Sequence, residues 1–390
     1  MTYTNAEKMI ENAPNIGSPD AAKQILGLLK NPEKKLQIIK VLGESGKSSV
    51  CSLLSAAISA AGYRVGRLTT PHIHSVRESV CVCERPVSIE LFTNAAENVS
   101  KQVTALRKSE ESADTVPSQS DLLLTTALCA FDESDCDVAI IEVARNESFS
   151  CIDEPIISVI TSTSDTRTAR EICLRLDRQS GEVITAMQSR EVYRIIFDKC
   201  AEINKRLTMP LRNAFIFMSA SVKRIEFTYN GTVHSVGTGA YYQIYNLLTV
   251  IEAVEALNRL GFNIPSTEIC SAVLSQGIPL RFEIISVMPT IIIDRADDEN
   301  RRRRLIESLK ILSTFTNDKP TVICESGKRK IAEEFALMSR DIATKEIPIK
   351  TARKELRSML SDLSDSDTLI ILGSSQYCEQ MAKITKDILM

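Results

Sequence analysis

A short glycine-containing segment at 43–49, Gly-Glu-Ser-Gly-Lys-Ser-Ser, combines the residue types that hold a phosphate. It follows an apolar run over 36–42 and precedes a run rich in Ala, Leu and Ser over 48–61. A strand that leads through glycines into a helix places backbone N–H groups around an anion. In such a loop, Lys47 reaches the outer phosphates and the hydroxyl of Ser48 or Ser49 binds Mg²⁺. The segment predicts nucleotide binding, with Gly43, Ser45 and Gly46 contributing backbone.

Two residues depart from a full phosphate-loop pattern. The complete Walker A motif has Gly at the position of Val41. Glu44 puts a negative charge near the expected phosphate. A tight turn that merely contains a lysine is the alternative interpretation. The strand and helix on either side of the turn favour nucleotide binding.

Histidine is scarce in this chain, with three residues in all: His72, His74 and His234. A Ser-His-Asp site or a metal site with several histidines has to draw on these three. One of them, His234, falls in a predicted hairpin. The composition therefore argues against both classes of site.

Composition indicates an ordinary globular protein of 390 residues with a formal net charge of −3. No basic excess points to a nucleic-acid partner, and no apolar run reaches the roughly 18 residues that cross a membrane. The N-terminus has no signal-peptide pattern. Eleven cysteines are scattered, mostly in apolar segments. We expect reduced thiols and a cytoplasmic protein. The close pair Cys81 and Cys83 has no second pair at zinc-ligand spacing.

Strand-like apolar runs alternate with helix-like amphipathic runs, which is the pattern of βαβ units and a largely parallel sheet. A polar stretch over 109–120 is expected to be a loop, and the Asn-Gly pair at 230–231 predicts a hairpin over 225–236. A helix is expected over 242–260. Further strands are expected in three apolar runs: 63–68, 138–143 and 156–161.

The alternation restarts after Gly-Ile-Pro at 277–279, with strands expected at 290–294, 320–324 and 368–373. We therefore predict an α/β protein with two domains. Residues 1–280 form a P-loop, parallel-sheet domain that binds ATP, and residues 281–390 form a smaller Rossmann-like domain. The arginine run 301–304 indicates a solvated helix start or, alternatively, a contact to a phosphate or to the first domain.

The order of these motifs resembles that of the folylpolyglutamate and dihydrofolate synthases, a family of the Mur ligase superfamily. That family has a Gly-Thr-Asn-Gly-Lys-Gly-Ser loop, similar to 43–49, and an Ala-Gly-Tyr-x-Val-Gly strand, similar to 61–66. Its Thr-Ser-Pro-His-Leu motif resembles 69–73, which contains Thr70, Pro71 and His72.

The resemblance continues almost to the C-terminus. Glu142 matches the family's magnesium-associated glutamate, and Gln243 and Asn246 match its Gln-x-x-Asn helix start. The segment 281–283 matches the end of its Gly-Arg-Phe-Glu motif, and Asp294 matches the aspartate of Asp-Gly-Ala-His-Asn. Residues 373–377 resemble its Gly-Ser-x-Tyr element. The matches cover most of the chain in the right order.

The resemblance implies a Mur-ligase-like fold and an ATP-dependent amide ligase that uses Mg²⁺. Its substrates would be a folate-like or other carboxylate acceptor and an amino acid. The residues implied are of four kinds. The loop 43–49, with Gln243, Asn246, Arg281 and Asp294, contacts the nucleotide, which would lie in a cleft between the domains. Ser49 and Glu142 hold the metal. Thr70, Pro71 and His72 line the substrate site, and the catalytic group is Lys47, Glu142, Asp165 and Arg178.

Departures from the family pattern concentrate where the chemistry is expected. Thr166 follows Asp165, where the family has a magnesium-binding histidine. Arg178 stands where the family has a lysine that is carbamylated, and a guanidinium cannot form that carbamate. Asp297 replaces a second histidine, Leu280 replaces a glycine, and 143–149 has no glycine. We therefore expect low or absent folate–glutamate ligase activity.

Two functions compete at this point. The first is an ATP-dependent amide ligase. The second is a catalytically silent relative, a pseudoenzyme, which binds a nucleotide or nothing and works through a protein partner. The intact phosphate loop favours the first, and the missing histidine and lysine favour the second. A nucleotide-dependent switch without ligation has no dedicated signal.

Each retained residue also has an ordinary interpretation. Glu142 can cap a strand end, and Gln243 and Asn246 can bond local backbone at a helix start. Arg281 can pair with a surface carboxylate, and His72 can be a polar residue lining a cleft. The order of all of them together favours the family interpretation.

Overall fold

The computed structural model divides into two compact units, each described here by itself. Unit 1 consists of Met1–Leu211 and Asn246–Ala272, and unit 2 of Arg212–Tyr245 and Val273–Met390. Both contain a sheet with parallel strands and covering helices, which confirms the predicted α/β class. The structure describes the following residues: 1–18, 20–70, 72, 75–108, 114–143, 152, 154–176, 179, 181–266, 269, 280–296, 299–315, 320–327, 333 and 343–389.

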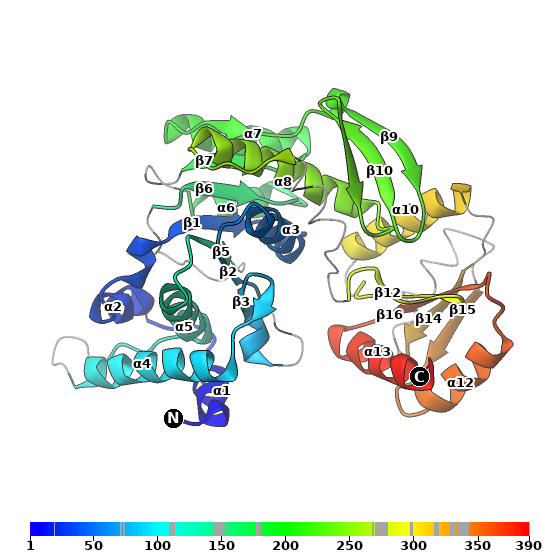
Figure 1. The fold of residues 1–390 in the computed structure, drawn as a ribbon, viewed down its shortest axis with the longest axis horizontal. Coiled ribbons are helices and arrows are strands. Elements are labelled where there is room, and N and C mark those ends of the chain that lie inside the picture. The colour runs from blue at the N-terminus through cyan, green and yellow to red at the C-terminus, as the bar shows by residue number, and fades with distance from the viewer. Residues whose placement is uncertain are drawn as a thin grey trace. The chain divides into compact units, whose positions relative to one another are not determined.

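Unit 1 is built on an eight-stranded sheet with the order β4-β3-β2-β5-β1-β6-β7-β8 (Figure 1). Six neighbouring strands, in the order β2-β5-β1-β6-β7-β8, pair in parallel. Strands β3 and β4 extend the sheet beyond β2 with antiparallel pairing. Buried apolar side chains fill the central strands, as expected for a sheet covered on both faces. The strands are β1 (Gln37–Leu42), β2 (Val65–Leu68), β3 (Val80–Val82), β4 (Arg85–Pro86), β5 (Val138–Glu142), β6 (Ile157–Ile160), β7 (Glu182–Thr185) and β8 (Leu207–Thr208).

Helices cover this sheet. A cluster of buried residues joins one face of the sheet to α1, α2, α4, α5, α6 and α7. Helix α3 contacts β1, β2 and β5. No helix in the described ranges is both long enough and apolar enough to cross a membrane. The helices are α1 (Tyr3–Glu11), α2 (Ala21–Leu28), α3 (Lys47–Ala60), α4 (Ile89–Arg107), α5 (Gln119–Glu133), α6 (Thr166–Cys173), α7 (Arg190–Glu202) and α8 (Tyr242–Arg259).

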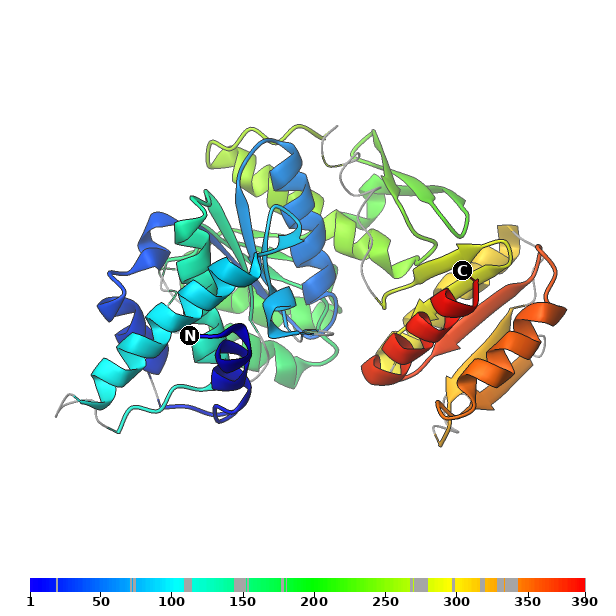
Figure 2. The same cartoon turned by 60° about the horizontal axis from the view of Figure 1, so that its bottom comes forward.

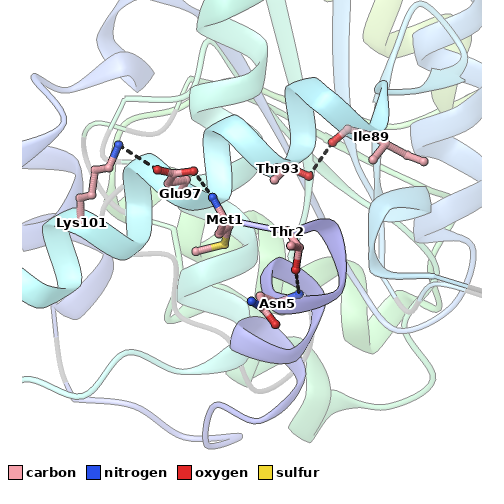
Figure 3. A network of polar contacts seen from close by, with 7 residues as sticks. All are labelled: Met1, Thr2, Asn5, Ile89, Thr93, Glu97 and Lys101. Carbon is pink, nitrogen blue, oxygen red and sulfur yellow. Dashed lines mark hydrogen bonds and ion pairs between the residues drawn. The ribbon is translucent and has the colours of Figure 1, made fainter.

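The first helix is tied to α4 by polar contacts (Figure 3). The Met1 ammonium group pairs with the Glu97 carboxylate. The same carboxylate forms an ion pair with Lys101, whose Nζ lies 3.1 Å from Oε1 of Glu97. The side chain of Thr2 caps α1 by accepting from the N–H of Asn5 at 3.3 Å. These contacts, with the ring of Tyr3 against Phe92, hold α1 against α4.

Unit 2 contains two sheets. The predicted hairpin is confirmed as β10 (Ile225–Tyr229) and β11 (Thr232–Val236), and β9 (Phe215–Ala220) adds an antiparallel third strand. The larger sheet has the order β12-β13-β16-β14-β15, with β12 antiparallel. Its strands are β12 (Glu283–Val287), β13 (Thr290–Asp294), β14 (Thr321–Glu325), β15 (Ala343–Ile347) and β16 (Thr368–Leu372).

Helices α10, α12 and α13 lie in the described part of unit 2. Helix α10 (Glu299–Phe315) shares a core with the face of the sheet that carries Ile292, Val322 and Ile370. Helices α12 (Ala352–Asp362) and α13 (Ser375–Leu389) contact each other and lie side by side along the sheet (Figure 2). Strand β13, which ends at Asp294, lies between β12 and β16 in this sheet.

Residues 212–245 belong to unit 2, whereas the predicted cut after 280 places them with the first domain. The reason is visible in their contacts. The N–H of Tyr241 donates to the Ser308 hydroxyl of α10 at 2.9 Å, and Ala240 is buried in the same core as Leu305. The cut after 280, as a boundary between sequence domains, stays a prediction, and 277–279 lie outside the described residues.

Candidate nucleotide-binding site

The phosphate-loop segment joins β1 to α3 through two glycines with left-handed backbone conformations. Gly43 has φ +125°, and a Cβ there would lie 2.2 Å from Oγ1 of Thr161. Gly46 has φ +94°, and a Cβ there would lie 2.5 Å from Oδ1 of Asn246. Both positions therefore require glycine, because of backbone strain and because of the close neighbour.

The backbone N–H groups of the loop fall into two sets. Those of Glu44 and Ser45 donate to the carbonyl of Ser162, at 3.2 and 3.1 Å, and so fasten the loop to the segment after β6. In the described structure the next three N–H groups, from Gly46 to Ser48, have no acceptor, and no side chain caps α3. An uncapped helix N-terminus with N–H groups available fits an anion.

The side chain of Lys47 lies over the same loop. Its Nζ donates to the Gly43 carbonyl at 3.1 Å. The ammonium group and the N–H groups at the start of α3 thus come from one short turn. This arrangement concentrates positive charge where the sequence predicts a phosphate.

The carboxylate of Glu44, which weakened the sequence argument, is bound elsewhere. Its Oε2 accepts from the N–H of Ser164 at 2.9 Å and from the hydroxyl of the same residue. Glu44 therefore clasps the loop to the segment between β6 and α6. Its charge is directed to those donors and not to the N-terminus of α3.

Asp165 is the N-cap residue of helix α6. Its Oδ1 accepts from the N–H of Thr168 at 2.8 Å, the N-cap geometry. That bond lowers the pKa of the Asp165 carboxyl, and a hydrogen bond from the Ser164 hydroxyl lowers the same pKa further. Thr166 is the first helical residue, so the expected catalytic aspartate serves locally as a cap.

Glu142 is the last residue of β5 and is only 3% exposed. It lies beside Val41 of β1, and its Oε2 accepts from the N–H of Thr70 at 3.3 Å. The expected metal carboxylate is thus linked to the start of the expected substrate segment. His72 in that segment is exposed, and Pro71 lies outside the described residues.

A buried thiol shows that several of these groups are near one another. Burial raises the pKa of Cys51 well above its usual value, and the Glu142 carboxylate raises it further. Arg67 and Lys47 act on the pKa of the same thiol in the opposite direction. The charges of Lys47, Glu142 and Arg67 therefore all act on the thiol of Cys51 in α3.

Arg67 was not singled out from the sequence. It lies on β2 with its side chain 11% exposed, and its Nη1 donates to the Ser52 hydroxyl of α3 at 3.1 Å. A second guanidinium nitrogen lies 3.6 Å from the Glu84 carboxylate. A charged residue inside an otherwise apolar strand was the available signal.

The residues present fit a magnesium ion that binds together with a nucleotide. Within the described ranges, no three His, Cys, Asp or Glu side chains converge. Mg²⁺ in nucleotide sites needs only one or two protein oxygens, because phosphates and waters complete its shell. The buried hydroxyl of Ser49 and the buried carboxylate of Glu142 are donors of that kind.

Helix α8 contains two of the residues that are expected to contact the nucleotide. Asn246 is 6% exposed, and its amide oxygen is the neighbour that excludes a side chain at Gly46. Gln243, on the first turn, is buried as well. Asn246 therefore forms a wall of the phosphate loop.

The remaining expected residues lie in unit 2 or outside the described residues. Asp294 is the last residue of β13 and is 2% exposed. Burial raises the pKa of its carboxyl, and the charge of Arg281 partly opposes this rise. The Nη1 of Arg281 donates to the carbonyl of Arg295 at 3.2 Å. Arg178 and Asp297 are not among the described residues, so the roles expected of them stay predictions.

Comparisons with known proteins agree on one lineage. No protein-family model matches the chain. The dihydrofolate synthase/folylpolyglutamate synthase of Bacillus subtilis (strain 168) is 26% identical over 336 residues, which is 79% of this chain and 75% of the relative. The folylpolyglutamate synthetase structure from Lactobacillus casei matches with a TM-score of 0.83, at 21% identity and 100% coverage of both chains. Mycobacterium tuberculosis folylpolyglutamate synthase, complexed with ADP and AMPPCP, matches at 0.80, with 18% identity and 98% coverage of both.

Proposed function

We propose that this chain, which belongs to the family of folylpolyglutamate and dihydrofolate synthases, is an ATP-dependent ligase that joins a carboxylate to an amine. The observation that carries the proposal is the uncapped start of α3 with Lys47 folded over it. Relatives of the same fold are named as complexes with ADP and with the ATP analogue AMPPCP. The acceptor we propose is a folate-like carboxylate, and the amine is that of an amino acid such as glutamate.

The proposed reaction has two steps, phosphorylation of the acceptor carboxylate and then amide formation. A carboxylate oxygen of the acceptor attacks the γ-phosphorus, the bond to ADP breaks, and an acyl phosphate forms. The amine nitrogen then attacks the acyl carbon, inorganic phosphate leaves, and the nitrogen loses a proton to give the amide. Lys47 and the N–H groups from Gly46 to Ser48 are placed to stabilise charge on the transferring phosphoryl oxygens.

Bound Mg²⁺ would supply further positive charge to those oxygens. Ser49 and Glu142 are the residues that we propose to hold it. The N–H of Thr70, bonded to Glu142, keeps that carboxylate fixed at the end of β5. Asn246 supports the loop from the side of Gly46. Gln243, Arg281 and Asp294 complete the proposed nucleotide contacts.

The rate with folate and glutamate is proposed to be low or zero. Thr166 begins α6 at the position where the resemblance places a metal-binding imidazole, so that imidazole ligand is missing here. Arg178 and Asp297 replace the carbamylated lysine and a second histidine. The same substitutions support the second candidate, a silent relative that binds a nucleotide and acts through a partner.

Calorimetric titration tests the nucleotide half of the proposal. The wild type is expected to bind Mg·ATP or Mg·ADP, and Lys47→Ala to weaken binding by at least about tenfold. Lys35→Ala is the matched control, because Lys35 pairs with Asp132 at the surface. Unfolding curves check that both variants fold. Absence of binding heat at millimolar nucleotide contradicts the proposal.

Product analysis tests the ligase half. Phosphate release and amide formation are measured with Mg·ATP, glutamate, and dihydropteroate or tetrahydrofolate. Slow release that requires both substrates supports a weakened ligase. Nucleotide binding with no amide product supports the silent relative. Robust folate- and glutamate-dependent release contradicts the proposed low rate and shows that other groups replace the missing ones.

A further inference from the structure

A hydrogen-bonded cluster in unit 2 connects the first residue of α8 to the turn that carries Arg281. The Tyr242 hydroxyl donates to Oδ2 of Asp294 at 2.9 Å. The backbone N–H of Phe282 donates to the same oxygen, also at 2.9 Å. We call Tyr242, Asp294 and Phe282 the Asp294 hub. One buried carboxylate oxygen thus bonds a helix start and a turn that lie 40 residues apart along the chain, from Tyr242 to Phe282.

The turn held by the hub has an unfavourable backbone. Leu280 has φ +56° and Phe282 has φ +53°, so two residues with side chains flank Arg281 in the left-handed region. Such conformations persist only where surrounding contacts impose them, and they cluster at ligand sites. The strain therefore requires an external restraint on both sides of Arg281.

Those restraints come from neighbouring strands. The N–H of Leu280 donates to Oε2 of Glu283 at 3.0 Å, and its carbonyl accepts from the N–H of Arg295 at 2.9 Å. The Phe282 ring is buried in the core under α10. The Asp294 carboxylate accepts the bond from the backbone N–H of Phe282 and a second bond from the side-chain hydroxyl of Tyr242.

The Arg281 side chain is less enclosed than the backbone that carries it. It is partly exposed, and its Nη1 donates to the carbonyl of Arg295, the residue after Asp294. The charge of Arg281 favours the ionised form of Asp294 and so opposes the cost of burying that carboxylate. The hub and the guanidinium are thus coupled through both backbone and charge.

We propose that Tyr242 is a positioning residue for nucleotide binding. Its hydroxyl, acting through Asp294, holds the 280–282 turn in the conformation that presents Arg281. This inference rests on the proposed function, in which Arg281 contacts the nucleotide. Tyr242 itself does not touch the ligand.

The test compares Tyr242→Phe with Tyr245→Phe in the full chain. Both remove one hydroxyl from the first turns of α8, and Tyr245 is 37% exposed and outside the hub. Amide hydrogen exchange at Phe282 and Arg295 reports on the turn without any nucleotide. Exchange is expected to accelerate in Tyr242→Phe and to match the wild type in Tyr245→Phe. Unfolding curves show whether the effect is local.

Calorimetric titration of Mg·ATP reports on function. Tyr242→Phe is expected to weaken binding by about fivefold, and Arg281→Ala by more. Because Tyr242 and Arg281 act through the same turn, the loss of affinity in the double variant is expected to be smaller than the sum of the two single losses. A general loss of structure would instead make the two effects add.

The outcomes separate this inference from the proposed function. Unchanged exchange at Phe282 in Tyr242→Phe overturns the inference, and so do additive losses in the double variant. If the wild type does not bind Mg·ATP, the proposed function fails and positioning for nucleotide binding fails with it. The exchange data then still decide whether Tyr242 holds the turn.

Discussion

Leu280 occupies a backbone conformation that glycine adopts at lower cost. Its φ is +56°, yet its side chain is only 5% exposed. Left-handed backbone costs a residue with a Cβ roughly 1–2 kcal/mol, whereas burial of a leucine side chain stabilises by about 1.5–3 kcal/mol. The leucine in place of the glycine of the family's Gly-Arg-Phe-Glu motif therefore adds backbone strain, and burial of its side chain offsets that strain.

This exchange predicts an unusual order of stabilities. Leu280→Ala loses the buried side chain and keeps the strain, but Leu280→Gly relieves the strain. We expect both to be less stable than wild type, with the glycine variant the more stable of the two by about 1 kcal/mol. At ordinary positions glycine is the less stable of the pair. Denaturant unfolding measures the difference, and an alanine variant that is equally stable or more stable contradicts the interpretation.

His234 is a buried histidine on β11, stacked on the ring of Phe227. Burial lowers its pKa below the ordinary value of 6.5. The unfolded chain therefore takes up a proton at a higher pH than the folded chain does. Its contribution to stability is complete above pH 6.5 and falls as the pH drops through the folded pKa.

We therefore expect His234→Phe to lose less stability than wild type between pH 7 and pH 5. The neutral ring keeps the aromatic neighbour of Phe227 and cannot be protonated. Denaturant unfolding at several pH values measures both slopes. Parallel profiles for the two proteins would show that His234 does not titrate in this range.

At the scale of elements, helix α5 starts with a complete capping box. The Ser118 hydroxyl accepts from the N–H of Asp121 at 3.1 Å, and the Asp121 carboxylate accepts from the N–H of Ser118 at 2.8 Å. The sequence placed 109–120 in a loop, and the structure begins α5 at Gln119. The Ser-x-x-Asp pattern was therefore the signal for the helix start.

Removal of this cap tests its value. Ser118→Ala is expected to lower the free energy of unfolding by about 1 kcal/mol, because a buried helix start loses its acceptor. Ser118→Thr keeps a hydroxyl at the same atom and is expected to retain most of the stability. Thermal and denaturant unfolding give the comparison. Equal losses in both variants would mean that packing around Ser118, and not the cap, sets the cost.

Elements with a local signal were predictable, and those fixed by distant contacts were not. The strand, glycine turn and helix around Lys47 stand next to one another in sequence, and the Asn-Gly pair marks the β10–β11 hairpin. Strand β9 was missed, because its apolar run has no clear alternation and its pairing contains a bulge. The bond between Tyr241 and Ser308 joins residues 67 positions apart, so no local pattern indicates it.

The candidate site follows the same rule. Lys47, Glu142 and Asn246 could be proposed from the sequence because each belongs to a motif with a fixed spacing. Arg67 and Tyr242 were missed, because what matters is their partners, Glu84 and Asp294, which lie far along the chain. Local sequence therefore indicates the groups proposed to face a ligand more readily than the groups that hold them in place.

On the scale of the whole molecule, each unit buries its own apolar core. Helix α8 is shared, since the division falls between Tyr245 and Asn246. The formal net charge of −3 gives no general attraction for polyanions. The proposed nucleotide binding therefore depends on the local geometry of the loop.

This reasoning predicts a selective thermal shift. Mg·ATP at about 100 times its dissociation constant stabilises a folded protein by about 2.7 kcal/mol, which raises Tm by roughly 5–10 °C for a unit of this size. Heparin, a polyanion without the geometry of a nucleotide, is expected to give no shift. Lys47→Ala removes the cation over Gly43 and should reduce the Mg·ATP shift to about half or less, while Lys35→Ala should preserve it. An equal shift in wild type and Lys47→Ala would place the nucleotide away from this loop, and a shift with heparin would mean that charge alone drives the binding.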